Sequence, residues 1–262
     1  MEKLFIKNRQ GLDISVVVDV TKEQKGLVFV MHGLGGFKEQ LHIQTFAKAF
    51  KEEGFTTVLF DTTNTFGESE GTYENATVTN YYFDLIDVIN WAKKQQWYEE
   101  PFWLIGHSLG GISIALYAEN FPEQVKAVAP ISTVVSGELH HQNIPKEKLN
   151  EFEKTGWRTS PSQSKPGIIK KLNWLQFSED IQKYDLLKEV NKLNMPVLLI
   201  VGDSDESTPL EHQKILFEKL LGDKELHVIK GAHHTFRGEV HLVEIKAIIK
   251  KWIKKVQMLS QE

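Results

Sequence analysis

The sequence has no cysteine among its 262 residues, and this absence removes several kinds of chemistry. A chain without thiols forms no disulfide, binds no metal through thiolates and has no cysteine nucleophile. An excess of one charge is also missing, because 31 Lys and Arg residues face 35 Asp and Glu residues, for a formal net charge of −4. No basic face interleaved with aromatic residues is evident, so we expect no nucleic-acid partner.

Long hydrophobic runs are absent as well. No apolar stretch approaches the roughly 20 residues that a membrane-spanning helix needs, and residues 1–7 lack the apolar centre of a secretory signal. We therefore expect a soluble, cytoplasmic protein that does not bind membranes, with monomer and homodimer both open. The length fits one large α/β domain with a substantial core.

Short apolar runs alternate with amphipathic segments along most of the chain. Strands are predicted at residues 4–7, 14–20, 27–31, 56–60, 102–105, 125–131, 197–201 and 225–229. Helices are predicted at about residues 40–53, 78–94, 111–120, 211–221 and 240–256. The first two strands are expected to form an antiparallel hairpin. The alternation after them is typical of a mostly parallel, eight-stranded sheet with helices on both faces.

Residues 134–185 interrupt this alternation. The segment is rich in Pro, Gly, Ser and Thr, and it contains two short helical patterns at residues 146–154 and 168–177. Because it follows a strand, we expect it to form a lid over the end of the sheet. The predicted organisation is a core of residues 1–133 and 186–262 with an inserted lid or cap of residues 134–185. The alternative is a surface excursion unrelated to any ligand.

The motif that carries chemistry is Gly106-His107-Ser108-Leu109-Gly110, which lies between a predicted strand and a predicted helix. A serine in so sharp a turn has a strained backbone that lifts its hydroxyl clear of the sheet. Its position at a helix N-terminus favours developing negative charge. Ser108 is therefore a candidate nucleophile, and a glycine-rich turn without chemistry is the alternative.

A second glycine-rich loop, His-Gly-Leu-Gly-Gly at residues 32–36, follows the third predicted strand. Acyl transfer needs two N–H donors aimed at the oxygen that becomes negative in the tetrahedral intermediate. The backbone N–H groups of Leu34 and Leu109 are the candidates for this oxyanion hole. Read alone, the loop is also consistent with a tight turn or a phosphate cradle, although it lacks the Gly-Lys-Ser/Thr of a P-loop.

Two polar loops follow the last two predicted strands. Asp205 lies in the first loop and is the candidate to orient a histidine, whereas Asp203 is expected to hold the turn or face solvent. His234 lies in the second loop and is preferred over His233 as a general base. A histidine suits this role because its ordinary pKa lies near neutrality and its two nitrogens can face a serine and a carboxylate. The order Ser, Asp, His predicts a catalytic triad with Ser108.

These motifs together resemble the α/β-hydrolase superfamily over nearly the whole chain. The likeness is greatest to small bacterial esterases of the cinnamoyl/feruloyl type and to their serine-aminopeptidase-like and dienelactone-hydrolase-like relatives. The family's Gly-x-x-Asp-x-x-x-Pro loop matches residues 202–209, and its Gly-x-x-His-x-Phe segment matches residues 231–236. A further Gly-x-Ser-x-Gly at residues 67–71 resembles a structural loop of the family that carries no nucleophile. His233 departs from the pattern, because an acidic or small residue is usual there.

The motifs and the resemblance predict an α/β-hydrolase fold and a serine hydrolase that cleaves carboxylic esters through an acyl-enzyme. Aromatic or cinnamoyl-type esters are among the expected small-molecule substrates, and no metal or organic cofactor is required. A serine peptidase or amidase would use the same triad. A non-catalytic binding protein on the same fold is the third reading.

Four aromatic residues of the insertion are candidates for the acyl or alcohol pocket. A segment with so little apolar content cannot pack alone, so its aromatic side chains must bury against the body or a ligand. Two of them, three positions apart on a short predicted helix, are expected to share one face. The alternative is that they only anchor the insertion. The four residues are Trp157, Trp174, Phe177 and Tyr184.

Overall fold

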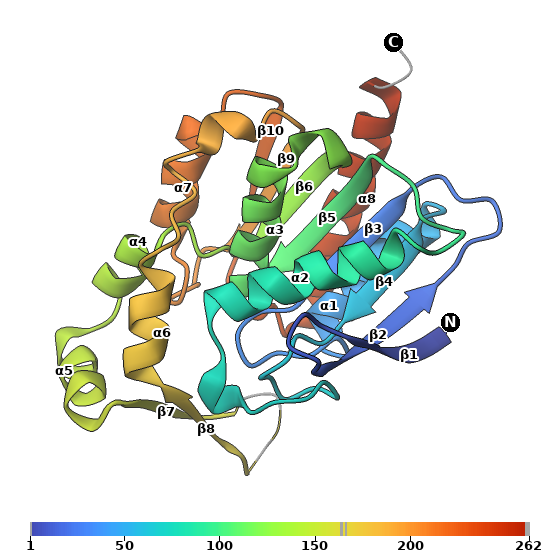
Figure 1. Cartoon of the computed structure of the whole chain (residues 1–262). Helices are drawn as coiled ribbons and strands as arrows, with labels where there is room; N and C mark the ends of the chain where they lie inside the picture. The colour runs from blue at the N-terminus through green and yellow to red at the C-terminus, as the bar shows by residue number, and fades with distance from the viewer. Residues whose placement is uncertain (1, 163–164, 166, 260–262) are drawn as a thin grey trace.

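The computed structural model describes residues 2–162, 165 and 167–259 (Figure 1). Its central sheet consists of β1 (Glu2–Lys7), β2 (Asp13–Asp19), β3 (Leu27–Met31), β4 (Thr56–Phe60), β5 (Phe102–His107), β6 (Val125–Ile131), β9 (Val197–Gly202) and β10 (Lys224–Ile229). The strand order is β1-β2-β4-β3-β5-β6-β9-β10. β2 pairs antiparallel with β1 and β4, and the pairs from β4 to β10 are parallel. The predicted hairpin and the mostly parallel sheet are confirmed.

Helices cover both faces of this sheet, as Figure 1 shows. The helices of the core are α1 (Leu41–Glu52), α2 (Val78–Ala92), α3 (Leu109–Asn120), α7 (Leu210–Lys219) and α8 (Glu239–Leu259). α1 and α8 pack together on one face, and α2, α3 and α7 lie on the other. Three short 3₁₀ helices are also described, namely η1 (Tyr73–Asn75), η2 (Pro122–Gln124) and η3 (Val190–Lys192).

Strand β3 is apolar throughout because both of its faces are buried. Val28 and Val30 belong to the hydrophobic cluster under α1 and α8, whereas Phe29 and Met31 belong to the cluster under α2 and α3. Successive side chains of a strand point to opposite faces, so a strand covered on both sides has no polar position. β4 and β5 are likewise buried along their length, although β4 begins with Thr56 and Thr57 and β5 ends at His107.

The insertion after β6 has its own short elements. They are α4 (Gly137–Gln142), α5 (Lys146–Thr155), β7 (Trp157–Pro161), β8 (Ile169–Asn173) and α6 (Trp174–Ile181). The two ends of the insertion meet, because Ser136 and Asp185 form an isolated β-bridge and Leu186 N–H donates to the carbonyl of Val135. The segment is thus closed at its base, near the predicted boundaries. Its role as a lid stays a prediction.

One expectation about the insertion is wrong. Residues 168–177 are not one helix, because β8 pairs antiparallel with β7 from Trp157 opposite Asn173 to Pro161 opposite Ile169. The helix begins only at α6, where the side chain of Asn173 accepts the N–H of Gln176 and caps it. The prediction failed for two reasons: it did not recognise Asn173 as the start of the helix, and the strand that pairs with β8 lies too far away in the sequence for a local pattern to indicate.

The insertion packs against the body near the carboxyl ends of the strands. β8 contacts η1, and α6 contacts α2 as well as α4. In Figure 1 this group of elements lies at the lower left, beside the ends toward which β5 and β6 point. None of the helices in the described ranges combines the length and the apolar character that crossing a membrane requires.

Candidate active site

Ser108 occupies the turn between β5 and α3 in a strained conformation, with φ 56° and ψ −114°. A residue with a side chain adopts such a conformation only when its surroundings over-determine it. Here the Ser108 N–H donates to the carbonyl of Ile131 at 3.0 Å, and its own carbonyl accepts the N–H groups of Ile112 and Val134. The backbone is therefore held on both sides, as the motif predicts.

Glycines around this turn are required by close backbone contacts. A Cβ on Gly106 would lie 2.5 Å from the carbonyl oxygen of Gly110, and one on Gly110 would lie 2.4 Å from that of His32. The loop after β3 also approaches the serine, because a Cβ on Gly33 would lie 2.9 Å from the Cβ of Ser108. The two glycine-rich motifs therefore pack directly against each other.

His234, in the loop between β10 and α8, connects the serine to a carboxylate. Its Nε2 lies 3.0 Å from Oγ of Ser108, and its Nδ1 lies 2.9 Å from Oδ2 and 3.1 Å from Oδ1 of Asp205. The carboxylate only accepts, so Nδ1–H donates to it and leaves Nε2 to accept from the serine hydroxyl. His233 does not take part, since its exposed ring is bonded to the carbonyl of Ser204.

Asp205 has a fully buried side chain that stays ionised. Burial, the largest effect, would raise its pKa, but the hydrogen bond and charge of His234 and the N–H of Thr208 hold the pKa below its ordinary value. The carboxylate also accepts the N–H of Ser207 and the hydroxyl of Thr208, each at 2.9 Å. Asp203 instead accepts the N–H of Gly231 at 2.7 Å, which holds the turn as expected.

A cavity of about 490 Å³ opens at this hydrogen-bonded chain. Ser108 and His234 line it together with Leu34 and Leu109, the two residues whose N–H groups are candidates for the oxyanion hole. The loop that carries Leu34 is positioned by Tyr81 of α2, whose hydroxyl accepts the N–H of Gly35 and donates to the carbonyl of Gly33. No feature of the sequence pointed to this role of Tyr81.

His107 is a second residue that the sequence analysis missed. Its Nε2–H donates to the backbone carbonyl of His234 at 2.7 Å, and the two rings lie 4.6 Å apart. Burial lowers the pKa of His107 well below its ordinary value, so the ring is neutral. His42 of α1 packs edge-on against its other side at 4.5 Å. The residue before the serine therefore holds the backbone of His234, a contact for which the Gly-x-Ser-x-Gly pattern carries no signal.

The four insertion aromatics do not act as a set. Phe177 lines the cavity, but the ring of Trp174 is buried between Phe177 and Phe152, at 6.2 and 5.2 Å between centroids. Trp157 packs under the ammonium of Lys171 at 3.9 Å, and the Tyr184 hydroxyl is bonded to Thr79 at 2.6 Å. These last three have anchoring contacts within the insertion and to α2, and their part in substrate binding stays a prediction.

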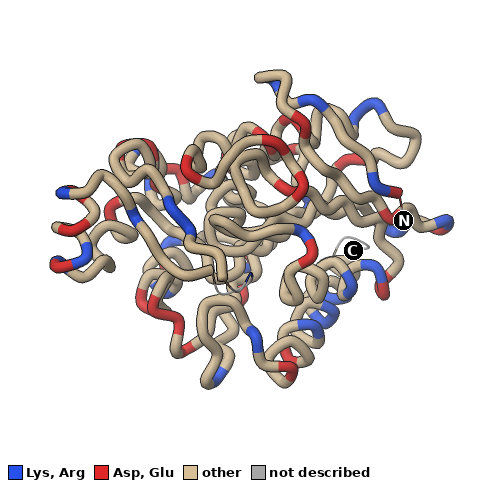
Figure 2. Tube along the Cα trace, turned by 90° about the horizontal axis from the view of Figure 1, so that it is seen from below, with Lys and Arg blue, Asp and Glu red and all other residues tan. Residues whose placement is uncertain are grey.

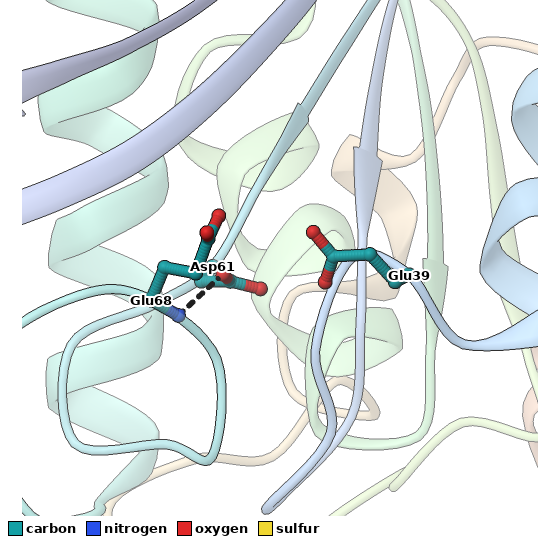
Figure 3. A group of neighbouring side chains, drawn as sticks. All are labelled: Glu39, Asp61 and Glu68. Atoms are coloured by element: carbon teal, nitrogen blue, oxygen red, sulfur yellow. Dashed lines mark hydrogen bonds between the residues drawn. The ribbon is translucent and has the colours of Figure 1, made fainter.

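Three carboxylates lie close enough together, within the described residues, to suggest a cation site: Glu39, Asp61 and Glu68 (Figure 3). Nζ of Lys38 lies among them, at 2.9, 2.6 and 2.7 Å respectively. Burial alone would lower the pKa of Lys38, but the bonds to Asp61 and Glu68 raise it above its ordinary value. An ammonium group already occupies the centre of this cluster and offsets part of its charge, and the cluster joins the loop after β3 to the loop after β4.

The second Gly-x-Ser-x-Gly lies in that same loop after β4. Oγ of Ser69 donates to the carbonyl of Asp61 at 2.7 Å and accepts the N–H of Ser15 at 2.8 Å. It lies away from the cavity formed around Ser108. The expected structural role of this motif is therefore consistent with its contacts.

The fold and this arrangement define an α/β hydrolase. The family model described as serine aminopeptidase, S33 (Hydrolase_4), matches residues 22–165, more than half of the chain, and the protein belongs to this family. The matched segment contains β3, the loop after it and the turn that carries Ser108.

Relatives and solved structures of similar fold include esterases and thioesterases. The chain is 27% identical to an uncharacterized 31.7 kDa protein in the traX-finO intergenic region of Escherichia coli, with 95% of this chain and 97% of that protein covered. It is 25% identical to mouse palmitoyl-protein thioesterase ABHD10, mitochondrial, with 92% and 80% covered. The structure of Est1E from Butyrivibrio proteoclasticus with bound ferulic acid has a TM-score of 0.80 at 22% identity, with 97% and 99% covered. These similarities support a hydrolase with relatives of the esterase and thioesterase type.

Proposed function

We propose that the protein is a serine hydrolase that cleaves carboxylic esters of small molecules through an acyl-enzyme. The observation that carries this proposal is the continuous hydrogen-bonded chain from Ser108 through His234 to Asp205 at the wall of a cavity. The three side chains come from loops after three different strands, and they have the geometry of a nucleophile, a general base and an orienting carboxylate.

In the first half-reaction, Oγ of Ser108 bonds to the ester carbonyl carbon while Nε2 of His234 takes the hydroxyl proton. The N–H groups of Leu34 and Leu109 stabilise the resulting oxyanion. The bond from that carbon to the alcohol oxygen then breaks, and His234 returns the proton to the departing alcohol. Asp205 keeps the imidazole in the productive tautomer and stabilises its cationic form.

In the second half-reaction, water replaces the serine as the attacking group. His234 takes a proton from water as the oxygen bonds to the acyl carbon, and the same two N–H groups stabilise the new oxyanion. The bond to Oγ of Ser108 breaks, and the proton passes from His234 to the serine oxygen. A carboxylic acid leaves and the free enzyme is restored.

The charges around the cavity favour an ester over a peptide with a free amino terminus as the substrate. A free amino terminus carries a positive charge, and a site that binds it needs a facing carboxylate. The described lining has Glu206 as its acidic residue, against Arg158, Lys170 and Arg237. This balance disfavours a cationic substrate, so an esterase explains the site better than an aminopeptidase.

A fluorophosphonate probe tests the nucleophile, and parallel assays test the substrate class. The probe should label the wild-type protein at Ser108 and leave Ser108→Ala unlabelled. Wild type should hydrolyse p-nitrophenyl acetate or butyrate, and Ser108→Ala should lose about three or more orders of magnitude in turnover while melting at the same temperature. Faster turnover of aminoacyl anilides than of esters would favour a peptidase instead, and full activity of clean Ser108→Ala would overturn the serine mechanism.

A further inference from the structure

The β7–β8 hairpin presents a cationic face to the cavity. Arg158 and Ser160 are two apart in β7, and Ser160 pairs with Lys170 in β8. Residues two apart in a strand, and directly paired residues in neighbouring strands, point to the same face of a sheet. All three line the cavity that also contains Ser108, so the hairpin forms a wall of the proposed catalytic site.

The two cations of this hairpin face have no counterion in the described structure. Arg158 and Lys170 are both half-buried, and no carboxylate of the described residues forms an ion pair with either. Some lysines elsewhere are ion-paired, as Lys255 is with Asp223 and Glu225 at 2.9 Å each, and Figure 2 shows residues of both charges spread along the chain. What distinguishes Arg158 and Lys170 is that both are half-buried and line the cavity.

The cations also repel one another. Burial lowers the pKa of Lys170, and the charges of Arg158 and Arg237 lower it further, so these three groups act on the same region. Arg237 follows the triad loop, and its Nε donates to the hydroxyl of Thr235 at 2.9 Å. Like charges such as Arg158 and Lys170, held together in a partly desolvated wall, are stabilised by an anion that lies between them.

The imidazole of His140 is a neutral polar group in the same part of the cavity lining. His140 of α4 also lines the cavity, and its buried Nδ1 has no hydrogen-bond partner within the described chain. Burial lowers the pKa of His140 to about 3, with Arg158 contributing, so the imidazole is neutral. The exposed Glu206 is the acidic residue of the described lining, and a single carboxylate leaves the wall positive.

We infer that the site takes esters that carry an anionic group, a carboxylate or a phosphate, which Arg158 and Lys170 bind while the ester carbonyl lies at Ser108. This inference rests on the proposed ester hydrolysis and specifies its substrate class. A guanidinium binds a carboxylate or phosphate through two parallel hydrogen bonds, and an ammonium adds a compact charge. The cavity is of a size that holds both the reacting ester and such a group.

Matched pairs of esters test the preference for charge. On the acyl side, the p-nitrophenyl monoester of adipic acid is compared with its neutral methyl diester, and a phosphonate in place of the free carboxylate separates the two anions. On the alcohol side, 4-carboxyphenyl acetate is compared with its methyl ester. In at least one pair the anionic member should have a kcat/KM about tenfold higher or more, and added salt should reduce this advantage.

Variants of the hairpin locate the preference. Arg158→Gln and Lys170→Gln should each lower kcat/KM for the preferred anionic ester by about 10- to 100-fold, while the neutral ester changes by less than about threefold. Lys171→Gln is the matched control, because it removes the same charge from the same hairpin, but its ammonium lies over Trp157. This control should keep the full preference, and melting temperatures should show that all three variants fold.

The outcomes separate the two proposals. If the fluorophosphonate labels Ser108 and neutral esters are hydrolysed, but no anionic member is preferred, the substrate inference is wrong and the hydrolase proposal stands. If the preference exists but survives both Arg158→Gln and Lys170→Gln, the assignment to this wall is wrong. If no labelling and no turnover of any ester occur, both proposals fail.

Discussion

The cavity has two kinds of wall, one from the loops at the strand ends and one from the insertion. The strand-end wall contains Ser108 in a strained, doubly held backbone, and the rings of His107 and His234 packed against each other. The insertion wall is a two-stranded hairpin with half-buried cations that have no ion pair within the described residues. The contrast is consistent with the two proposals, which place the chemistry at the strand-end wall and the substrate choice at the insertion wall.

The largest expected effect tests the rigid wall through its carboxylate. Asp205→Asn should lower kcat by about 10²- to 10⁴-fold, because an amide can offer an N–H to Nδ1 and favour the wrong tautomer of His234. Asp203→Asn, a change of the same kind two residues away, should stay within about tenfold, since Asp203 only holds the turn. Steady-state kinetics on one activated ester measures both. A loss of equal size in the two variants would show that the loop, and not the carboxylate, is responsible.

The second prediction separates anchoring from lining within the insertion. Trp174→Ala should lower the free energy of unfolding by about 3–5 kcal/mol, because it empties a buried site between Phe152 and Phe177. Phe177→Ala should change KM for bulky esters more than for acetates, because Phe177 also faces the cavity. Denaturant unfolding and an ester panel measure the two effects. Unchanged stability of Trp174→Ala would contradict the anchoring role.

A third prediction concerns a buried carboxyl group near the C-terminal end of α3. Glu119 of α3 is buried, and its Oε1 has no hydrogen-bond partner among the described residues. Burial raises the pKa of Glu119 to about 8, assisted by the charge of Glu189. Because the folded pKa lies above the unfolded value, this group destabilises the fold progressively as pH rises from about 4.5 to 8. Glu119→Gln should therefore raise the unfolding free energy by about 1–4 kcal/mol at pH 8.

The pH dependence supplies the control for that variant. At pH 4, where the carboxyl is protonated in both folded and unfolded chains, Glu119→Gln and wild type should differ little in melting temperature. The gain should grow between pH 5 and pH 8. A gain that is the same at pH 4 and pH 8 would mean that packing, and not ionisation, is responsible. Glu119 does not line the cavity, whereas Lys170 does. Removal of the charge of Lys170 should therefore change the ester preference, and Glu119→Gln should not.

The smallest effect is expected at His107, which positions the triad histidine. His107→Leu removes the donor to the carbonyl of His234 and should lower kcat by about tenfold, with little change in KM. His107→Gln keeps an N–H donor and should recover part of that loss. A plain packing role predicts the opposite order, because Leu suits the buried site better than Gln. The kcat ratio of the two variants distinguishes these possibilities.

Much of the core could be predicted from sequence because its constraints are local. The apolar run of β3 is buried on both faces, and the glycines at 106 and 110 are demanded by backbone contacts within one turn and with the neighbouring loop. The order of Ser108, Asp205 and His234 was informative because each follows a strand, and parallel strands end at one edge of a sheet.

Only the tertiary structure decided what surrounds that triad. Tyr184 meets Thr79 from 105 residues away, Trp174 fills a space against Phe152, and β8 becomes a strand because β7 is there to pair with it. Arg158 and Lys170 come to share one wall through that same pairing. Such positions depend on contacts between distant segments, for which a local pattern carries no signal. The turn at Ser108 is different, because steric limits within its own few residues already require glycine at position 106.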